Sequence, residues 1–154
     1  MNDPASCKDD SPEISDSDRL LRRIHSREAP GGRIRPGAFE DFFLSVDVEN
    51  KMEFQPLEFL GSAYPRNLLF QNRKKEGEKL LKKGWKVVAL RPETPRNFGQ
   101  NVYPEPCDVG FKDGIYRNIA HAKICGKKTD ELCFELAEEA NQNIILSQGN
   151  PSGF

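Results

Sequence analysis

Apolar side chains are spaced along the first part of the chain in ways that predict three β-strands. Every second residue from Phe42 to Val48 is apolar, so a strand within residues 38–48 would place these side chains on one face. Residues 85–90 (WKVVAL) are almost continuously apolar, which is typical of a strand buried on both faces. The shorter apolar group in residues 18–24 (DRLLRRI) is expected to form a further strand.

The C-terminal part predicts a strand, a helix and a second strand in succession. Alternating residues 119–125 (IAHAKIC) are followed by a helical pattern over residues 130–141 and by the apolar residues 143–147 (NIILS). Thr129 is expected to cap the helix, and acidic side chains occupy its first turn. The apolar stripe of this helix consists of Leu132, Cys133, Leu136, Ala137 and Ala140.

A second main helix is predicted over residues 67–83. Side chains from Leu69 to Leu81 recur at four-residue spacing, and two lysines precede Gly84, a usual helix end. A shorter helical turn is expected at residues 56–60.

Residues 91–117 contain four prolines and three glycines. Proline lacks a backbone N–H and glycine weakens regular structure, so no element longer than five or six residues is expected there. A stretch of this kind inside a compact domain is usually functional or mobile.

These elements predict a single small α+β domain over residues 18–148, with a mixed sheet of four or five strands and two main helices. A chain of 154 residues is long enough to bury a core of its own. Residues 1–17 are rich in Ser, Asp and Pro and almost lack apolar side chains, which predicts a disordered acidic tail. Residues 149–154 are expected to be a frayed end.

The net charge of −1 hides an alternation of charged blocks along the chain. Residues 1–18 and 36–65 are acidic, whereas residues 19–35 and 66–91 are basic. Such blocks provide complementary patches for another protein, so a protein partner is expected.

The apolar runs are too short for a transmembrane helix or a signal peptide, which predicts a cytoplasmic protein with no membrane partner. The four cysteines, at positions 7, 107, 125 and 133, are too sparse for a disulfide scaffold and are expected to be reduced thiols. Only His121 and Cys125 approach the spacing of zinc ligands, and a strand would separate them by about 13 Å. No metal site and no cofactor are predicted.

Lys127, Lys128 and Thr129 follow Gly126 at a junction between a predicted strand and a helix. The segment lacks the glycines of a nucleotide-binding loop, so no nucleoside triphosphate site is predicted. The free N–H groups of the helix start still make these three residues a candidate for binding a phosphate or carboxylate, against the alternative of an ordinary solvated cap.

The basic segment offers a candidate surface for nucleic acid, because regularly spaced cations can follow a phosphate backbone. The alternative is a solvated helix face, since glutamates are interleaved and stacking aromatics are few. The candidate residues are Arg73, Lys74, Lys75, Lys79, Lys82 and Lys83.

Several short motifs resemble a group of short, uncharacterised bacterial proteins. They are R-R-I at residues 22–24, A-F at 38–39, L-S-V-D at 44–47 and H-A with G-K-K within residues 121–128. The resemblance implies a bacterial origin, with a role in a defence or toxin-type system, and implies no particular activity.

The first of these motifs also faintly resembles the opening strands of ADP-ribosyltransferase-like domains. That resemblance implies NAD binding by Arg22 or Arg23 on one strand and by Ser45 on the next. His121 is a further candidate catalytic residue because histidine can transfer protons, although a structural histidine is the simpler interpretation.

Three functions therefore stay open. The leading prediction is a protein-interaction or accessory module that uses residues 91–117 and the charged blocks around them. The alternatives are an NAD- or phosphate-handling enzyme with Arg22, Arg23, Ser45 and His121 in its pocket, and a nucleic-acid-binding protein. No complete catalytic set identifies an enzyme.

Overall fold

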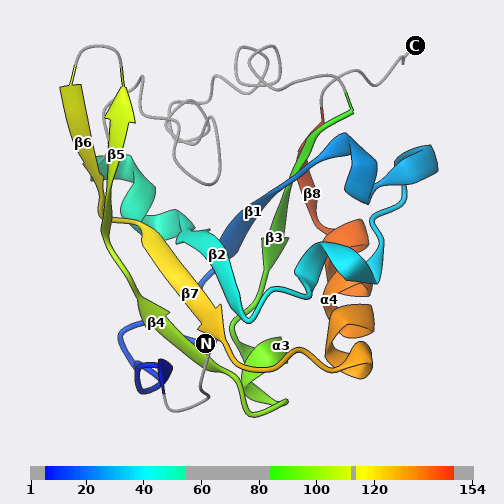
Figure 1. The fold of residues 1–154 in the computed structure, drawn as a ribbon, viewed down its shortest axis with the longest axis horizontal. Coiled ribbons are helices and arrows are strands. Elements are labelled where there is room, and N and C mark those ends of the chain that lie inside the picture. The colour runs from blue at the N-terminus through cyan, green and yellow to red at the C-terminus, as the bar shows by residue number, and fades with distance from the viewer. Residues whose placement is uncertain (1–5, 55–83, 112–113, 148–154) are drawn as a thin grey trace.

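The computed structural model describes residues 6–54, 84–111 and 114–147 (Figure 1). The described strands are β1 (Leu20–Ile24), β2 (Phe43–Val48), β3 (Lys86–Leu90), β4 (Asn101–Pro104), β5 (Cys107–Phe111), β6 (Gly114–Asn118), β7 (His121–Cys125) and β8 (Ile144–Ser147), and the described α-helices are α3 (Glu93–Arg96) and α4 (Asp130–Gln142). Short 3₁₀ turns connect them, including Pro36–Phe39 before β2. The predicted α+β class is therefore confirmed.

The main sheet has six strands in the order β4-β7-β2-β1-β3-β8, and every neighbouring pair is antiparallel. β5 and β6 form a separate two-stranded hairpin, which Figure 1 shows extending beyond the sheet from β4 and β7. The prediction of a mixed sheet with four or five strands is thus corrected. Five of these strands, β1, β2, β3, β7 and β8, lie within segments predicted to be strands.

The strands that sequence reasoning missed, β4, β5 and β6, lie in the stretch rich in proline and glycine, except that β6 ends one residue beyond it, at Asn118. Each is five residues or shorter, so the predicted limit on element length is confirmed. Pro104 is accommodated because β4 is an edge strand of the sheet, where one row of backbone N–H groups needs no partner strand.

α4 packs its apolar stripe against one face of the sheet. All five predicted stripe residues are buried, and the hydroxyl oxygen of Thr129 accepts a hydrogen bond from the Leu132 amide at 3.2 Å. Both the stripe and the helix cap are therefore confirmed. The same core contains Leu44, Val46 and Val48, which are the alternating side chains of β2.

β3 is buried on both faces, as its apolar run predicted. Val88 and Leu90 belong to the core under α4, whereas Val87 and Ala89 belong to a smaller cluster on the opposite face. Trp85 packs against that smaller cluster.

Residues 6–17, named here the N-terminal strap, are ordered against the sheet, so the prediction of a disordered tail is wrong for this segment. Ile14 is completely buried in the main core. The Ser11 amide donates to the Val102 carbonyl at 2.9 Å, and the Asp10 carboxylate accepts from the Val102 amide at 2.7 Å. Composition misled the prediction because a single apolar anchor and specific polar partners are enough to order a short segment that joins an existing domain.

The strap is also linked covalently to the sheet by a disulfide between Cys7 and Cys125. The expectation of reduced thiols is therefore wrong for these two residues, while Cys107 and Cys133 are not in a disulfide. The error arose because 118 positions separate the two cysteines, so no sequence spacing indicates the pair.

Several predictions fall on residues outside the described ranges. These are the helices at residues 56–60 and 67–83, the frayed end at 149–154, the first five residues of the tail and all six nucleic-acid candidates. Of the helices that are described, none is long and apolar enough to cross a membrane.

Candidate functional site

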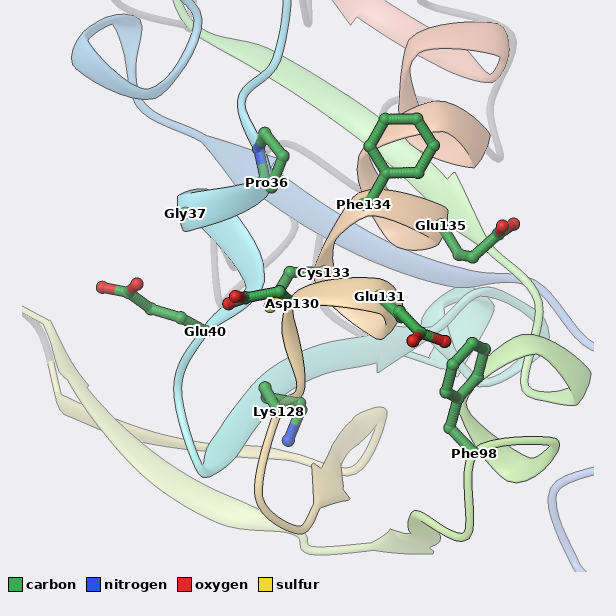
Figure 2. A pocket seen from close by; sticks show the side chains of 10 residues that line it. All are labelled: Pro36, Gly37, Glu40, Phe98, Lys128, Asp130, Glu131, Cys133, Phe134 and Glu135. Carbon is green, nitrogen blue, oxygen red and sulfur yellow. The ribbon is translucent and has the colours of Figure 1, made fainter.

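A groove of about 650 Å³ lies beside the N-terminal half of α4 and is named here the α4 groove (Figure 2). The turn Pro36–Phe39 and the loop after α3 contribute its other walls. The residues that line it are Pro36, Gly37, Glu40, Phe98, Lys128, Asp130, Glu131, Cys133, Phe134 and Glu135.

Two large apolar side chains of the groove are exposed to solvent. Phe134 on α4 is 55% exposed, and Phe98 on the loop after α3 is 38% exposed. Figure 2 shows that they come from separate elements. Exposed aromatic side chains within a polar rim are typical of a surface that contacts another molecule.

The rim of the groove is acidic. Glu40, Asp130, Glu131 and Glu135 are all exposed, and Lys128 is the one basic side chain among the ten that line the groove. Asp130 and Glu131 lie in the first turn of α4, where the helix dipole favours negative charge. The groove therefore favours a cationic ligand over an anionic one.

Lys128 has a structural role in the floor of this groove. Its ammonium donates to the carbonyl oxygens of Phe42 and Ile124 at 3.0 Å and of Gly126 at 2.9 Å. A lysine ammonium has three N–H groups, so all of them are used by the backbone. Burial lowers the pKa of Lys128 from 10.5 to about 8, because the charged form loses its hydration.

The three predicted anion-binding residues therefore differ in their surroundings. Thr129 caps α4 and Lys128 binds three carbonyls, so both side chains already have partners within the fold. Lys127 is exposed, and its carbonyl accepts from the Gln100 side chain at 3.0 Å. The geometry fits the alternative of a helix cap better than an anion site.

The predicted pocket residues Arg22 and Arg23 lie on opposite faces of the sheet, because neighbouring residues of a strand alternate. Arg22 lies on the α4 side, where its guanidinium donates to the carbonyls of Ser45 at 2.9 Å and Ala38 at 3.2 Å. Burial lowers the pKa of Arg22. The guanidinium of Arg23 lies over the Trp85 ring, 5.0 Å from its centroid. A single pocket that contains both arginines is therefore excluded.

Ser45 and His121 do share a face, the one opposite α4, and sequence reasoning missed two neighbours there. Ser45 pairs across the strands with Lys123, and Asp47 pairs with His121. We name these four residues the polar square. The signal for it was present in the sequence, since S-V-D and H-A-K each place two polar side chains on one face of a strand.

The members of the polar square have defined contacts. The Lys123 ammonium donates to the Ser45 hydroxyl at 2.8 Å, and both side chains are half-buried. Asp47 is completely buried, and its carboxylate accepts a hydrogen bond from the side-chain amide Nδ2 of Asn118 at 3.0 Å. Nδ1 of the buried His121 lies 2.7 Å from the carbonyl oxygen of Glu105. In the tautomer in which Nδ1 donates to this oxygen, Nε2 is the acceptor nitrogen of the ring.

Metal-ligating side chains are not grouped in the part of the chain that the structure describes. No three His, Cys, Asp or Glu residues of that part lie together as a metal site requires. His121 and Cys125 are at opposite ends of β7, and Cys125 is bonded to Cys7.

Comparisons with known proteins found no matching family model, no matching curated protein and no matching solved structure. The resemblance to short bacterial proteins and to ADP-ribosyltransferase-like domains thus stays an expectation from short motifs.

Proposed function

We propose that this protein is an interaction module that binds a basic segment of a partner protein in the α4 groove. The proposal rests on one observation: two exposed phenylalanines, Phe98 and Phe134, and four exposed carboxylates line the same groove. Such a surface fits a segment with lysines or arginines on either side of an apolar side chain.

The two kinds of contact have different roles. Covering the exposed part of each phenylalanine contributes about 1 to 2 kcal/mol, by the area it removes from water. The carboxylates attract a cationic segment and fix its orientation, an effect that salt weakens. Phe98 lies in the stretch predicted to bind a partner, so the proposal keeps that part of the prediction and adds α4.

The test uses the fluorescein-labelled peptide GKRFRKG and fluorescence anisotropy. We expect saturable binding that weakens as salt is added, and weaker binding of the analogues GKRARKG and GEEFEEG. Phe134→Ala should lower the affinity by about fivefold, which corresponds to ~1 kcal/mol. The double variant Glu131→Gln/Glu135→Gln should lower both the affinity and its salt dependence.

Matched controls lie outside the groove. Ile144 is 40% exposed and Glu93 is exposed, so Ile144→Ala and Glu93→Gln remove a similar apolar side chain and a similar charge elsewhere. If the peptide fails to bind at millimolar concentration, or if Phe134→Ala and Ile144→Ala bind it equally, the proposed function is wrong.

The second candidate function is NAD or phosphate binding on the face of the sheet that carries the polar square. What supports it is the half-buried Lys123–Ser45 pair, since an ammonium and a hydroxyl 2.8 Å apart can both donate to a phosphate oxygen. Arg23 belongs to the same face as these residues and lies over Trp85, the single tryptophan of the chain.

Trp85 fluorescence tests this candidate directly. NAD binding beside Arg23 and Ser45 should change the emission with saturation, and Lys123→Met should abolish the change. An emission that neither NAD nor inorganic phosphate alters in the wild-type protein would exclude the candidate. Nucleic-acid binding remains a prediction from the sequence alone.

A further inference from the structure

The Cys7–Cys125 disulfide lies between two segments that each lead to the α4 groove. Cys7 lies near the start of the N-terminal strap, and Cys125 ends β7 just before the turn that carries Lys128. One path from the disulfide therefore reaches the Phe98 side of the groove and the other reaches its floor.

The strap holds the loop that carries Phe98. The Arg96 guanidinium contacts the carboxylate of Asp10 at 3.0 Å, the carboxylate of Asp16 at 2.9 Å and the carbonyl of Ser11 at 2.8 Å. Arg96 is the last residue of α3, and the Phe98 amide donates to the Pro95 carbonyl at 3.0 Å. The position of Phe98 therefore depends on how firmly the strap holds Arg96.

The path from Cys125 returns to the same loop. The Gly126 amide donates a hydrogen bond to the Phe42 carbonyl at 3.0 Å. The Lys127 carbonyl accepts a hydrogen bond from Nε2 of the Gln100 side chain at 3.0 Å. Gly126 has a φ of +146°, and a Cβ atom there would lie 2.6 Å from Nε2 of Gln100, so the close approach requires glycine. The N-terminal strap contacts the loop after α3 (the α3 loop), and this loop contacts the turn after β7. The disulfide links that turn back to the strap, so the three segments form a closed ring.

We propose that the Cys7–Cys125 disulfide is a redox latch that controls the affinity of the α4 groove for its partner. This inference rests on the proposed function and adds its regulation. Where disulfides occur in reducing compartments, they are usually transient and redox-sensing.

The reductant is a protein or small-molecule dithiol. Its thiolate attacks Sγ of Cys7, which is half-buried and therefore more accessible than Cys125 with 1% exposure. Cys125 leaves as a thiolate and takes a proton, and the second thiol of the reductant then releases Cys7. Two electrons and two protons pass to the protein, and the reductant becomes a disulfide.

Reduction leaves the strap held by weaker contacts. The side chains of Asp10 and Asp16 are 40% and 61% exposed, and ion pairs at such positions contribute little stability. Ile14 still anchors the strap in the core, so the expected change is local loosening of the α3 loop rather than unfolding. The affinity of the groove then falls in proportion to the fraction of time that its wall is in place, by roughly threefold to tenfold.

The first experiment counts thiols in the full-length protein. Denatured without reductant, the protein should be alkylated at two cysteines, and after reduction at all four. Alkylation of four cysteines without reductant would overturn the proposal.

The second experiment measures hydrogen exchange, which needs no partner. The amides of Phe98, Gly99 and Gln100 should exchange at least about fivefold faster in the reduced protein and in Cys7→Ser. Cys107→Ser is the matched control and should leave these rates unchanged. Asp10→Asn/Asp16→Asn keeps the disulfide and should also speed exchange, which covers the case in which Cys7→Ser does not fold.

Binding of the peptide GKRFRKG to oxidised and reduced protein completes the test. Weaker binding after reduction, with faster exchange in the α3 loop, is the expected result. Unchanged exchange overturns the latch even if the peptide binds, and unchanged affinity despite faster exchange overturns the control of binding. Faster exchange with no peptide binding in either state instead shows that the proposed function has failed.

Discussion

The ammonium group of Lys128 joins the loop before β2 to the end of β7. Its three acceptors are the backbone carbonyls of Phe42, Ile124 and Gly126. Phe42 is more than eighty positions away from the other two in the sequence. A bound cation of this kind sets the shape of the groove floor without offering its charge to a ligand. Arg22 acts in a similar way between Ser45 and Ala38, since its guanidinium donates to the carbonyl oxygens of both residues.

Lys128 should give the protein a characteristic dependence on pH. Its pKa is about 8 in the folded protein and 10.5 in an unfolded chain, so the unfolded state binds more protons between these values. The unfolding free energy contributed by this group therefore rises as the pH increases from about 8 to about 10.5.

Urea unfolding of the wild type and of Lys128→Met at several pH values measures this contribution, because other titrating groups cancel in the difference. The wild type should gain stability relative to the variant over this range, and should show no relative change below pH of about 7. Two curves that stay parallel up to pH of about 10.5 would contradict the assignment.

At the scale of elements, α4 is defined almost entirely by local signals. Its cap, its acidic first turn and its five-residue apolar stripe are close together in the sequence, and all of them appear in the structure. The helix start also forms one wall of the groove, so its stability bears on the site as well as on the fold.

Replacing the cap should show this dependence. Thr129→Ala removes the acceptor of the Leu132 amide and should lower the unfolding free energy by about 1 kcal/mol, whereas Thr129→Ser should retain most of it. Thermal unfolding followed by circular dichroism makes the comparison. Equal losses in the two variants would show that the methyl group, rather than the hydroxyl, is the source of the stability.

Most of the sheet was predictable for the same reason, since β1, β2, β3, β7 and β8 each carry their own apolar pattern. β4 was not, because Pro104 is normally excluded from strands and is allowed here only by the position of β4 at the sheet edge. Strand order depends on how all the strands assemble, so the apolar pattern of a single segment does not predict it.

The candidate site was less predictable than the fold. The sequence drew attention to Lys128 and Arg22 as cations, but their carbonyl partners come from the folded backbone and leave no mark in the sequence. Phe98 and Phe134 are far apart along the chain, and only the packing of the α3 loop beside α4 brings them to one groove.

At the scale of the whole molecule, the disulfide encloses most of the chain in one covalent loop. Residues at its two ends are 118 positions apart. In the chain-entropy view, closing a loop of this length reduces the freedom of the unfolded state and stabilises the fold by about 5 kcal/mol.

Global stability should therefore respond to reduction. Unfolding by guanidinium with and without a dithiol should show a loss of several kcal/mol, with the strap variant Cys7→Ser equal to the reduced wild type. A loss of less than about 1 kcal/mol would mean that the unfolded chain gains little freedom when the link is broken.

Asp10 and Ser11 bond both backbone groups of Val102 on β4, at the edge of the sheet. An open edge strand is a template on which another chain can add a strand, and so a starting point for aggregation. The N-terminal strap thus occupies this edge and keeps another chain from pairing with β4 there. A chain shortened to begin after residue 17 would keep every strand of the sheet and yet offer that template to its neighbours.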